Sequence, residues 1–213
     1  MQLDFPSASV KCILCVGAHS DDIEIGAGAT LLSLAPRFPE AAVHWVVLAG
    51  GNRRSAEARA SAAFFSSGFG KAEIVVHDFR DGFFPTQLAN LKECLEGLKP
   101  VAPDLVFTHY REDRHQDHRT VSDLTWQTFR DHLILEYEIP KFDGDLGAPN
   151  LFHPVSVADR DRKLEALDRF FGSQRDKRWF TDDTFSGLMR LRGIECNAES
   201  GFAEAFYCRK MVI

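Results

Sequence analysis

Two stretches of the sequence gather the residue types that bind metal ions and move protons. The first, "GAHSDDIEIGAGAT" at residues 17–30, places a histidine and two adjacent aspartates directly after an apolar run. Two neighbouring carboxylates repel each other, so something nearby must make the pairing favourable. The second, "REDRHQDH" at residues 111–118, contains two histidines with a glutamine and an aspartate between them.

A divalent cation would account for these residues. Zn²⁺ prefers imidazole and carboxylate ligands, and a catalytic zinc site needs three protein ligands with an open position for water. One histidine and one aspartate of the first stretch, with one histidine of the second, would supply this set. The two stretches therefore predict a metal centre, provided that the fold brings them to the same place.

The elements that position these residues follow an alternating pattern. Short apolar runs rich in β-branched residues predict buried strands, most of them parallel, and amphipathic patterns predict the helices between them. The strands are expected at residues 11–18, 42–49, 71–77, 103–108, 133–139 and 202–209, and the helices at 26–37, 55–67, 87–98, 119–131 and 158–171. This order predicts an α/β fold, a single-domain doubly wound, mostly parallel sheet of Rossmann-like type with helices on both faces.

The predicted topology places both stretches at one edge of the sheet. Ligand sites of doubly wound sheets lie outside the carboxyl ends of the strands. The first stretch leaves the first strand and the second leaves the fourth strand. One domain is expected to span residues 1–213, with a variable loop at 140–157 that is either a lid or a subunit contact.

Composition limits the classes of function. The chain has 213 residues, of which 45% are hydrophobic and 26% charged, as expected for a soluble globular protein. Its net charge of −6 argues against a general nucleic-acid binder, and no apolar run is long enough for a membrane span. The chain has five cysteines, an odd number, which predicts reduced, mostly buried thiols and a cytoplasmic location.

The two stretches resemble the signatures of a known enzyme family. "GAHSDDIEIGAGATL" is similar to the A-H-P-D-D-x-x-x-G-x-G-G-T signature of the LmbE-like or PIG-L N-acetyl sugar deacetylases, and "PDLVFTHYREDRHQDHRTV" to their H-P-D-H signature. Weaker similarity appears in "RRSAEARAS", "KLEALDRFFGSQ" and "FAEAFY", so the resemblance spans most of the chain. It implies a metal-dependent hydrolase that removes the acetyl group of an N-acetyl sugar, its small-molecule partner.

The resemblance also implies a role for each chemical position. The metal ligands would be His19, Asp22 and His118. The catalytic residues would be Asp21 as general base, His115 as the group that stabilises the oxyanion and protonates the amine, and Asp117, which would hold the His115 ring and keep it cationic.

Some features depart from the family pattern without touching its chemistry. Ser20 and Gln116 stand where the family usually has proline, which reduces backbone stiffness but leaves these chemical positions intact. Zn²⁺ is the expected metal, and Fe²⁺ suits the same ligands under reducing conditions. Arg54 and Arg114 are predicted to contact a hydroxyl, phosphate or carboxylate group of the substrate.

Two alternatives stay open at the level of sequence. The substrate could be another small N-acyl amide, or the chain could be a non-catalytic nucleotide-binding domain of Rossmann-like type. The glycines at 26 and 28 do not complete a dinucleotide-binding pattern, however, so close helix packing is their expected role. Relatives of this kind often form trimers or hexamers, so the resemblance favours a homo-oligomer.

Overall fold

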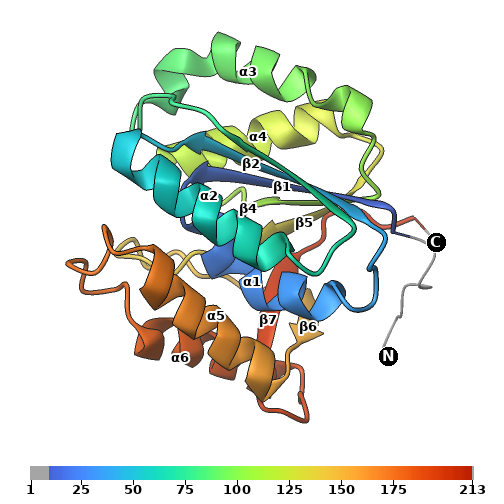
Figure 1. Ribbon diagram of the computed structural model, residues 1–213, viewed down its shortest axis with the longest axis vertical. Coiled ribbons are helices and arrows are strands. Elements are labelled where there is room, and N and C mark those ends of the chain that lie inside the picture. Colours follow the sequence, from blue (N-terminus) through green and yellow to red (C-terminus); the bar gives the residue numbers. More distant parts are fainter. Residues whose placement is uncertain (1–9, 213) are drawn as a thin grey trace.

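Five parallel strands form the centre of the sheet in the computed structural model, which describes residues 10–212. They are β1 (Cys12–His19), β2 (Ala42–Ala49), β3 (Lys71–Val76), β4 (Leu105–His109) and β5 (Leu133–Tyr137). The full sheet has the order β3-β2-β1-β4-β5-β7-β6, in which β7 (Ala203–Tyr207) is antiparallel to both β5 and β6 (Leu151–Pro154). The predicted mostly parallel α/β sheet is confirmed (Figure 1).

Helices cover both faces of this sheet. One face carries α1 (Asp22–Leu34), α2 (Asn52–Ser66), α5 (Val157–Phe170) and α6 (Asp182–Glu195), and the other carries α3 (Leu88–Glu96) and α4 (Gln116–Thr128) (Figure 1). Two short 3₁₀ helices, η1 (Phe84–Gln87) and η2 (Lys99–Val101), flank α3. Alternate residues of β1 join different cores: Ile13 and Cys15 pack on the α1 side, Leu14 and Val16 on the α4 side. The period of two in strand side chains thus builds two hydrophobic layers from one apolar run.

The order of the strands creates a crevice between β1 and β4. These strands are neighbours, but the helix that follows β1 lies on one face of the sheet and the helix that follows β4 lies on the other. The two connections therefore diverge at the carboxyl ends of the strands, which is where open α/β sheets bind their ligands.

Two glycines let α1 lie close to its neighbours. A Cβ atom on Gly26 would overlap the ring of Tyr137 on β5, and one on Gly28 would lie 2.8 Å from the ring of Phe65 on α2. The packing role predicted for these glycines is confirmed, and it seats the first turn of α1 at the crevice.

Three helices begin three or four residues earlier than the sequence predicted: α2 begins at Asn52 rather than at residue 55, and the other two lie at the crevice. α1 begins at Asp22 rather than at residue 26, and α4 begins at Gln116 rather than at residue 119. Apolar periodicity locates the buried face of a helix, but the first turns of these two helices are polar because they contribute to the crevice. As a result, Asp22 and His118 lie in first helical turns rather than in loops.

The region after β5 also differs from the prediction. The loop expected at 140–157 is interrupted by β6, a short edge strand that ends at Pro154. Helix α6 was not predicted, because Gly187 and Gly193 weaken the helical pattern of its sequence. Gly193 is needed where the helix passes the backbone of Gly201, which a Cβ atom would overlap.

The cysteine side chains can be compared with the sequence prediction. All five cysteines are free thiols, as predicted, but only Cys15 is buried and the other four are half-buried. They lie near the ends of elements, where part of each side chain reaches the surface. Across residues 10–212, no helix combines the length and the apolar character that crossing a membrane requires.

Candidate metal centre

The junction of β1 and α1 separates the two adjacent aspartates. His19 ends the strand, Asp21 is the N-cap residue and Asp22 is the first helical residue. The backbone N–H of His19 donates to Oδ2 of Asp22 over 2.7 Å, which turns this carboxylate back toward the strand. The Asp21 carboxylate makes no capping hydrogen bond. The two acids therefore have different surroundings although they are neighbours in the chain.

The first turn of α4 supplies two histidines to the same crevice. His115 is the N-cap residue, and its Nδ1 accepts a hydrogen bond from the backbone N–H of Asp117 over 3.3 Å. His118 is buried, and its ring stacks on that of His115 with 4.6 Å between ring centroids. The edge of the His115 ring faces His19, at 4.9 Å between centroids.

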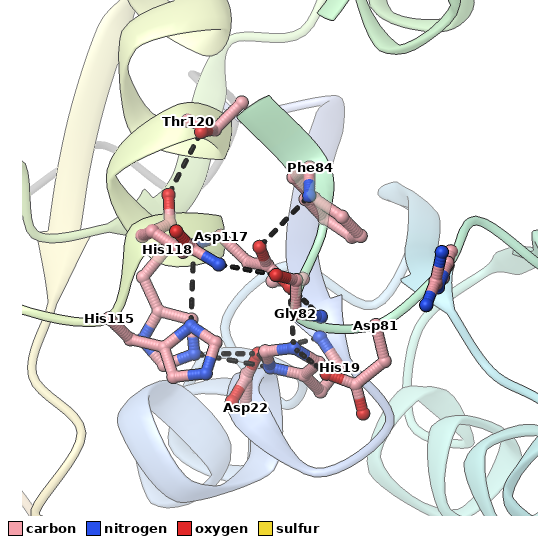
Figure 2. Close-up of polar contacts among 12 residues, drawn as sticks. His19, Asp22, Asp81, Gly82, Phe84, His115, Asp117, His118 and Thr120 are labelled. Carbon is pink, nitrogen blue, oxygen red and sulfur yellow. Dashed lines mark hydrogen bonds and ion pairs between the residues drawn. The ribbon is translucent and has the colours of Figure 1, made fainter. Parts of the chain in front are cut away.

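The three predicted metal ligands point their donor atoms at one another (Figure 2). Nδ1 of His19 lies 3.2 Å from Nε2 of His118 and 3.3 Å from Oδ2 of Asp22, and these last two atoms are 3.5 Å apart. Ligand atoms about 2.0–2.1 Å from a tetrahedral ion are about 3.3–3.4 Å from one another. The triangle therefore has the dimensions that a divalent cation would require.

The protonation of the isolated cluster is consistent with a cation site. Burial, followed by the nearby His109, lowers the pKa of His118 to about 4, so its ring is neutral at pH 7 and able to bind a metal. Burial opposes ionisation of Asp22, but the surrounding histidines outweigh it and hold its pKa well below the usual range. Burial also works against a charged His19, yet Asp22 and the neighbouring carboxylates raise its pKa well above normal. His19 thus carries an extra proton among these carboxylates, and a metal ion could replace that proton.

Each candidate histidine ligand has a carboxylate on its other ring nitrogen. Nδ1 of His118 lies 2.9 Å from Oδ2 of Asp113, and Nε2 of His19 lies 3.1 Å from Oδ1 of Asp81. Such outer carboxylates fix the tautomer and orientation of a metal-binding imidazole. Sequence reasoning did not single out Asp81 or Asp113, although both stand in loops that follow strand ends.

The carboxylate of Asp117 has partners other than the predicted one. It accepts hydrogen bonds from the backbone N–H groups of Gly82, at 2.6 Å, and Phe84, at 3.1 Å. Its Oδ2 also lies 3.4 Å from Nε2 of His19. Only the backbone of Asp117 contacts the His115 ring, so the expected contact between this carboxylate and that ring is replaced by a link between His19 and the 82–84 turn (Figure 2).

His115 is also less basic than the sequence suggested. Burial, together with the charge on His19, lowers its pKa, although the neighbouring aspartates act in the other direction. Since Nδ1 accepts the N–H of Asp117, a neutral ring carries its proton on Nε2. His115 is thus a neutral hydrogen-bond donor in this structure rather than a permanent cation.

Asp21 has the properties of a base held away from water. The residue is 5% exposed, and burial followed by the charge of Asp22 raises its pKa to about 6. Lys177 and His19 act in the opposite direction through their positive charge. A carboxylate with this pKa is ionised at pH 7 but accepts a proton more readily than an ordinary aspartate.

The two predicted substrate contacts have different environments. Arg54, on the first turn of α2, pairs with Oδ2 of Asp81 over 2.5 Å and is linked through that residue to His19. The side chain of Arg114 is exposed, and its backbone N–H donates to Oδ2 of Asp145 over 2.6 Å.

A further histidine at the centre was missed by sequence reasoning. His109, fully buried at the end of β4, stacks on His118 with 4.0 Å between ring centroids. Its Nε2 accepts the backbone N–H of Ala18 and lies 3.2 Å from Oδ2 of Asp22. The only sequence signal for it is its place at the carboxyl end of an apolar run.

The sequence of the chain matches a known protein family. A model of the PIG-L family, described as GlcNAc-PI de-N-acetylase, matches residues 14–129, a range that includes both stretches of the centre. The chain belongs to the PIG-L family. This PIG-L protein is also 33% identical over 173 residues to the uncharacterized deacetylase YaiS of Escherichia coli (strain K12). The aligned region covers 75% of this chain and 90% of YaiS.

Solved structures share the fold of this PIG-L protein at low identity. N,N'-diacetylchitobiose deacetylase from Pyrococcus horikoshii, in complex with its inhibitor MPG, superposes with a TM-score of 0.73 at 20% identity, over 95% of this chain and 85% of the other. GalB, the 4-carboxy-2-hydroxymuconate hydratase of Pseudomonas putida KT2440, gives 0.72 at 19% identity, over 95% and 98%. Because a deacetylase and a hydratase share this fold, the reaction has to be argued from the site.

Proposed function

We propose that this PIG-L protein is a metal-dependent hydrolase that removes the N-acetyl group from an N-acetylated amino sugar. The products would be acetate and the free amine. The observation that carries the proposal is the triangle of His19 Nδ1, Asp22 Oδ2 and His118 Nε2, with sides of 3.2 to 3.5 Å, directly beside Asp21. Membership of a family of deacetylases supports the same reaction.

The proposed metal ligands are His19, Asp22 and His118. Two nitrogens and one carboxylate oxygen suit Zn²⁺, and Fe²⁺ is the second candidate for the same set. A divalent cation held there supplies Lewis acidity, which makes a water molecule more acidic and polarises the amide carbonyl.

Asp21 is the proposed general base. Its carboxylate accepts a proton from the attacking water as the new bond forms between the water oxygen and the amide carbon. A pKa raised to about 6 by burial leaves the group ionised at pH 7 and basic enough to take that proton.

His115 is the proposed acid. Its Nε2–H is available to donate because Nδ1 is engaged by the backbone N–H of Asp117. The N–H stabilises negative charge on the carbonyl oxygen. To act as the acid, the ring first takes up a second proton; it then gives its Nε2 proton to the departing nitrogen as the carbon–nitrogen bond breaks, and the ring becomes neutral again. The proton that Asp21 takes from water replaces the one that His115 gives up, and the other proton of water is released as acetate leaves ionised.

Asp117 is proposed as a positioning residue for His19. Its carboxylate links that ring to the backbone of the 82–84 turn, which carries the rim of the site next to Asp81. Arg54 and Arg114 are proposed as contacts for polar groups of the sugar, and Arg54 would reach them from its position beside Asp81. The description of the family model as a de-N-acetylase of GlcNAc-PI supports an amino sugar as substrate.

Acetate release measured over a panel of N-acetyl sugars, nucleotide sugars and small N-acyl amides tests the proposal. We expect metal-loaded protein to release acetate from at least one N-acetyl sugar and to lose this activity when a chelator removes the metal. Protein that holds no stoichiometric divalent metal, or that releases acetate equally well after chelation, would refute metal dependence. Activity confined to amides without a sugar would instead support the wider class of N-acyl amide hydrolases.

A further inference from the structure

Lys141 is a buried lysine beside the candidate metal centre. Its side chain is 8% exposed, although it lies in the loop that follows β5. Its Nζ lies 2.9 Å from Oδ2 of Asp113 and 2.6 Å from Oδ2 of Asp145. An ammonium group is seldom placed out of water unless it is paired in this way.

The first of these partners contacts a candidate metal ligand. The same Oδ2 atom of Asp113 lies 2.9 Å from Nδ1 of His118, and its Oδ1 accepts the backbone N–H of His115 over 2.7 Å. Asp113 is therefore held by three groups at once: a lysine, an imidazole and a backbone amide. Its position decides where the His118 ring directs Nε2.

The second partner ties two segments of backbone together. Asp145 accepts the backbone N–H of Arg114 over 2.6 Å while it binds Lys141. The turn at 113–115 is thereby fastened to the segment at 141–145. That turn leads directly into the first turn of α4, where His118 lies.

The loop around Lys141 has a second attachment that does not involve the centre. The hydroxyl of Tyr207 accepts the backbone N–H of Gly147 over 3.0 Å, and Arg192 donates to the carbonyl of Gly147 over 3.0 Å. The loop is therefore anchored at two separate points. Only the anchor at Lys141 reaches a metal ligand.

We propose that Lys141 is a positioning residue for His118 that acts through Asp113, which makes the 140–147 segment part of the metal centre. The inference rests on the proposed metal site. Lys141 and His118 share one carboxylate oxygen, so the ammonium fixes that oxygen where the imidazole needs its acceptor. Its removal would leave Asp113 buried with less compensating charge and would free the turn that carries it.

Metal affinity tests this role without an activity assay. In Lys141→Met, which keeps the length of the side chain but not its charge, we expect the Zn²⁺ dissociation constant from competition with a chromophoric chelator to rise about 10-fold. The visible absorption of the Co²⁺-loaded variant should also change, because the orientation of His118 sets the ligand field. Both measurements are made on full-length protein whose folded fraction is known from circular dichroism.

Tyr207→Phe is the matched control. This variant removes the hydrogen bond that Tyr207 accepts from Gly147 and the one that it donates to Glu138, which loosens the same loop, but it touches neither Asp113 nor His118. We expect its Zn²⁺ affinity and its Co²⁺ spectrum to match those of the wild type. An equal loss of affinity in both variants would show that loop rigidity alone matters and would overturn the inference.

A double-mutant cycle tests the route through Asp113. If Lys141 acts through this carboxylate, Asp113→Asn combined with Lys141→Met should bind Zn²⁺ no more weakly than Asp113→Asn alone. Additive losses would overturn that route, and unchanged affinity in Lys141→Met would overturn the role itself. If the wild type binds neither Zn²⁺ nor Co²⁺, the proposed function fails together with the inference; if the wild type binds and Lys141→Met binds equally well, the inference alone fails.

Discussion

Nδ1 of His19, at the end of β1, lies 3.2 Å from Nε2 of His118, in the first turn of α4. A carboxylate oxygen of Asp22 lies 3.3 Å from the first nitrogen and 3.5 Å from the second. These three atoms have the spacing of three ligands around a tetrahedral metal ion. The outer ring nitrogens of the two histidines face Asp81 and Asp113. The centre is thus built from residues at the end of a strand, residues in the first turns of two helices, and carboxylates from two loops.

Asp21→Asn should retain the metal and lose most of the turnover. The amide cannot accept the proton of water, and a general base typically contributes about 10²–10⁴-fold to the rate. Acetate release and metal content measured on the same sample check this. Asp123→Asn, at an exposed position of α4, is the control and should behave as the wild type. Normal turnover in Asp21→Asn would remove Asp21 as the base, and loss of metal would identify it as a ligand.

His118→Ala should lose both metal and activity. Mutation of a residue that only hydrogen-bonds to a metal ligand weakens metal binding by up to about 100-fold. Loss of the ligand itself is expected to weaken binding by more than that. Chelated wild-type protein should regain acetate release when Zn²⁺ is added back, whereas His118→Ala should not at the same concentration. His44→Ala, on β2 beside Glu73, is the control and should bind metal normally.

His115→Asn should separate catalysis from folding. Asparagine is a favourable N-cap residue, so the variant can still accept the N–H of Asp117 and start α4. It has no ring N–H to give to the departing amine, and kcat should fall about 10²-fold or more while metal content stays at the wild-type level. An unchanged kcat with normal metal content would exclude His115 as the acid.

Asp117→Asn distinguishes two roles for this carboxylate. The structure joins it to His19 and to the backbone of Gly82 and Phe84, so the variant should bind Zn²⁺ about 10–100-fold more weakly. Had the carboxylate served the His115 ring, kcat would fall at saturating metal while the Zn²⁺ dissociation constant stayed constant. Measuring kcat at several Zn²⁺ concentrations separates these outcomes.

His153 should make the fold less stable in acid. Burial lowers the pKa of this histidine, whose Nε2 lies 3.0 Å from Oγ of Ser33. Below the ordinary histidine pKa of about 6.5 the unfolded chain binds a proton that the folded chain resists, so the free energy of unfolding falls as pH falls. In His153→Gln, urea unfolding at a series of pH values from 7 to 5 should show a smaller decline than in the wild type. An equal decline would show that other groups account for the acid sensitivity.

Much of the fold was predictable because it depends on local patterns. The apolar run of β2 was predicted at its observed bounds, and the other central strands were placed within two residues of theirs. Helix α6 was not predicted, since Gly187 and Gly193 look like helix breakers until the close approach of Gly201 is known. The short strand β6 depends on pairing with β7, a partner some fifty residues further along the chain, which no local pattern reveals.

The sequence by itself determined the order of the five central strands and the helices between them, the family, and the positions of the candidate ligands within their two stretches. The elements follow from the periodic pattern of apolar residues. The candidate ligands within each stretch are only a few residues apart, so local backbone geometry brings them close together. Only the tertiary structure decided the outer partners: Asp81 for His19, Asp113 with Lys141 for His118, and the 82–84 turn for Asp117. Those partners come from separate loops that meet at the crevice between β1 and β4, and contacts across such a crevice are set by how the strands and helices pack rather than by any spacing along the chain.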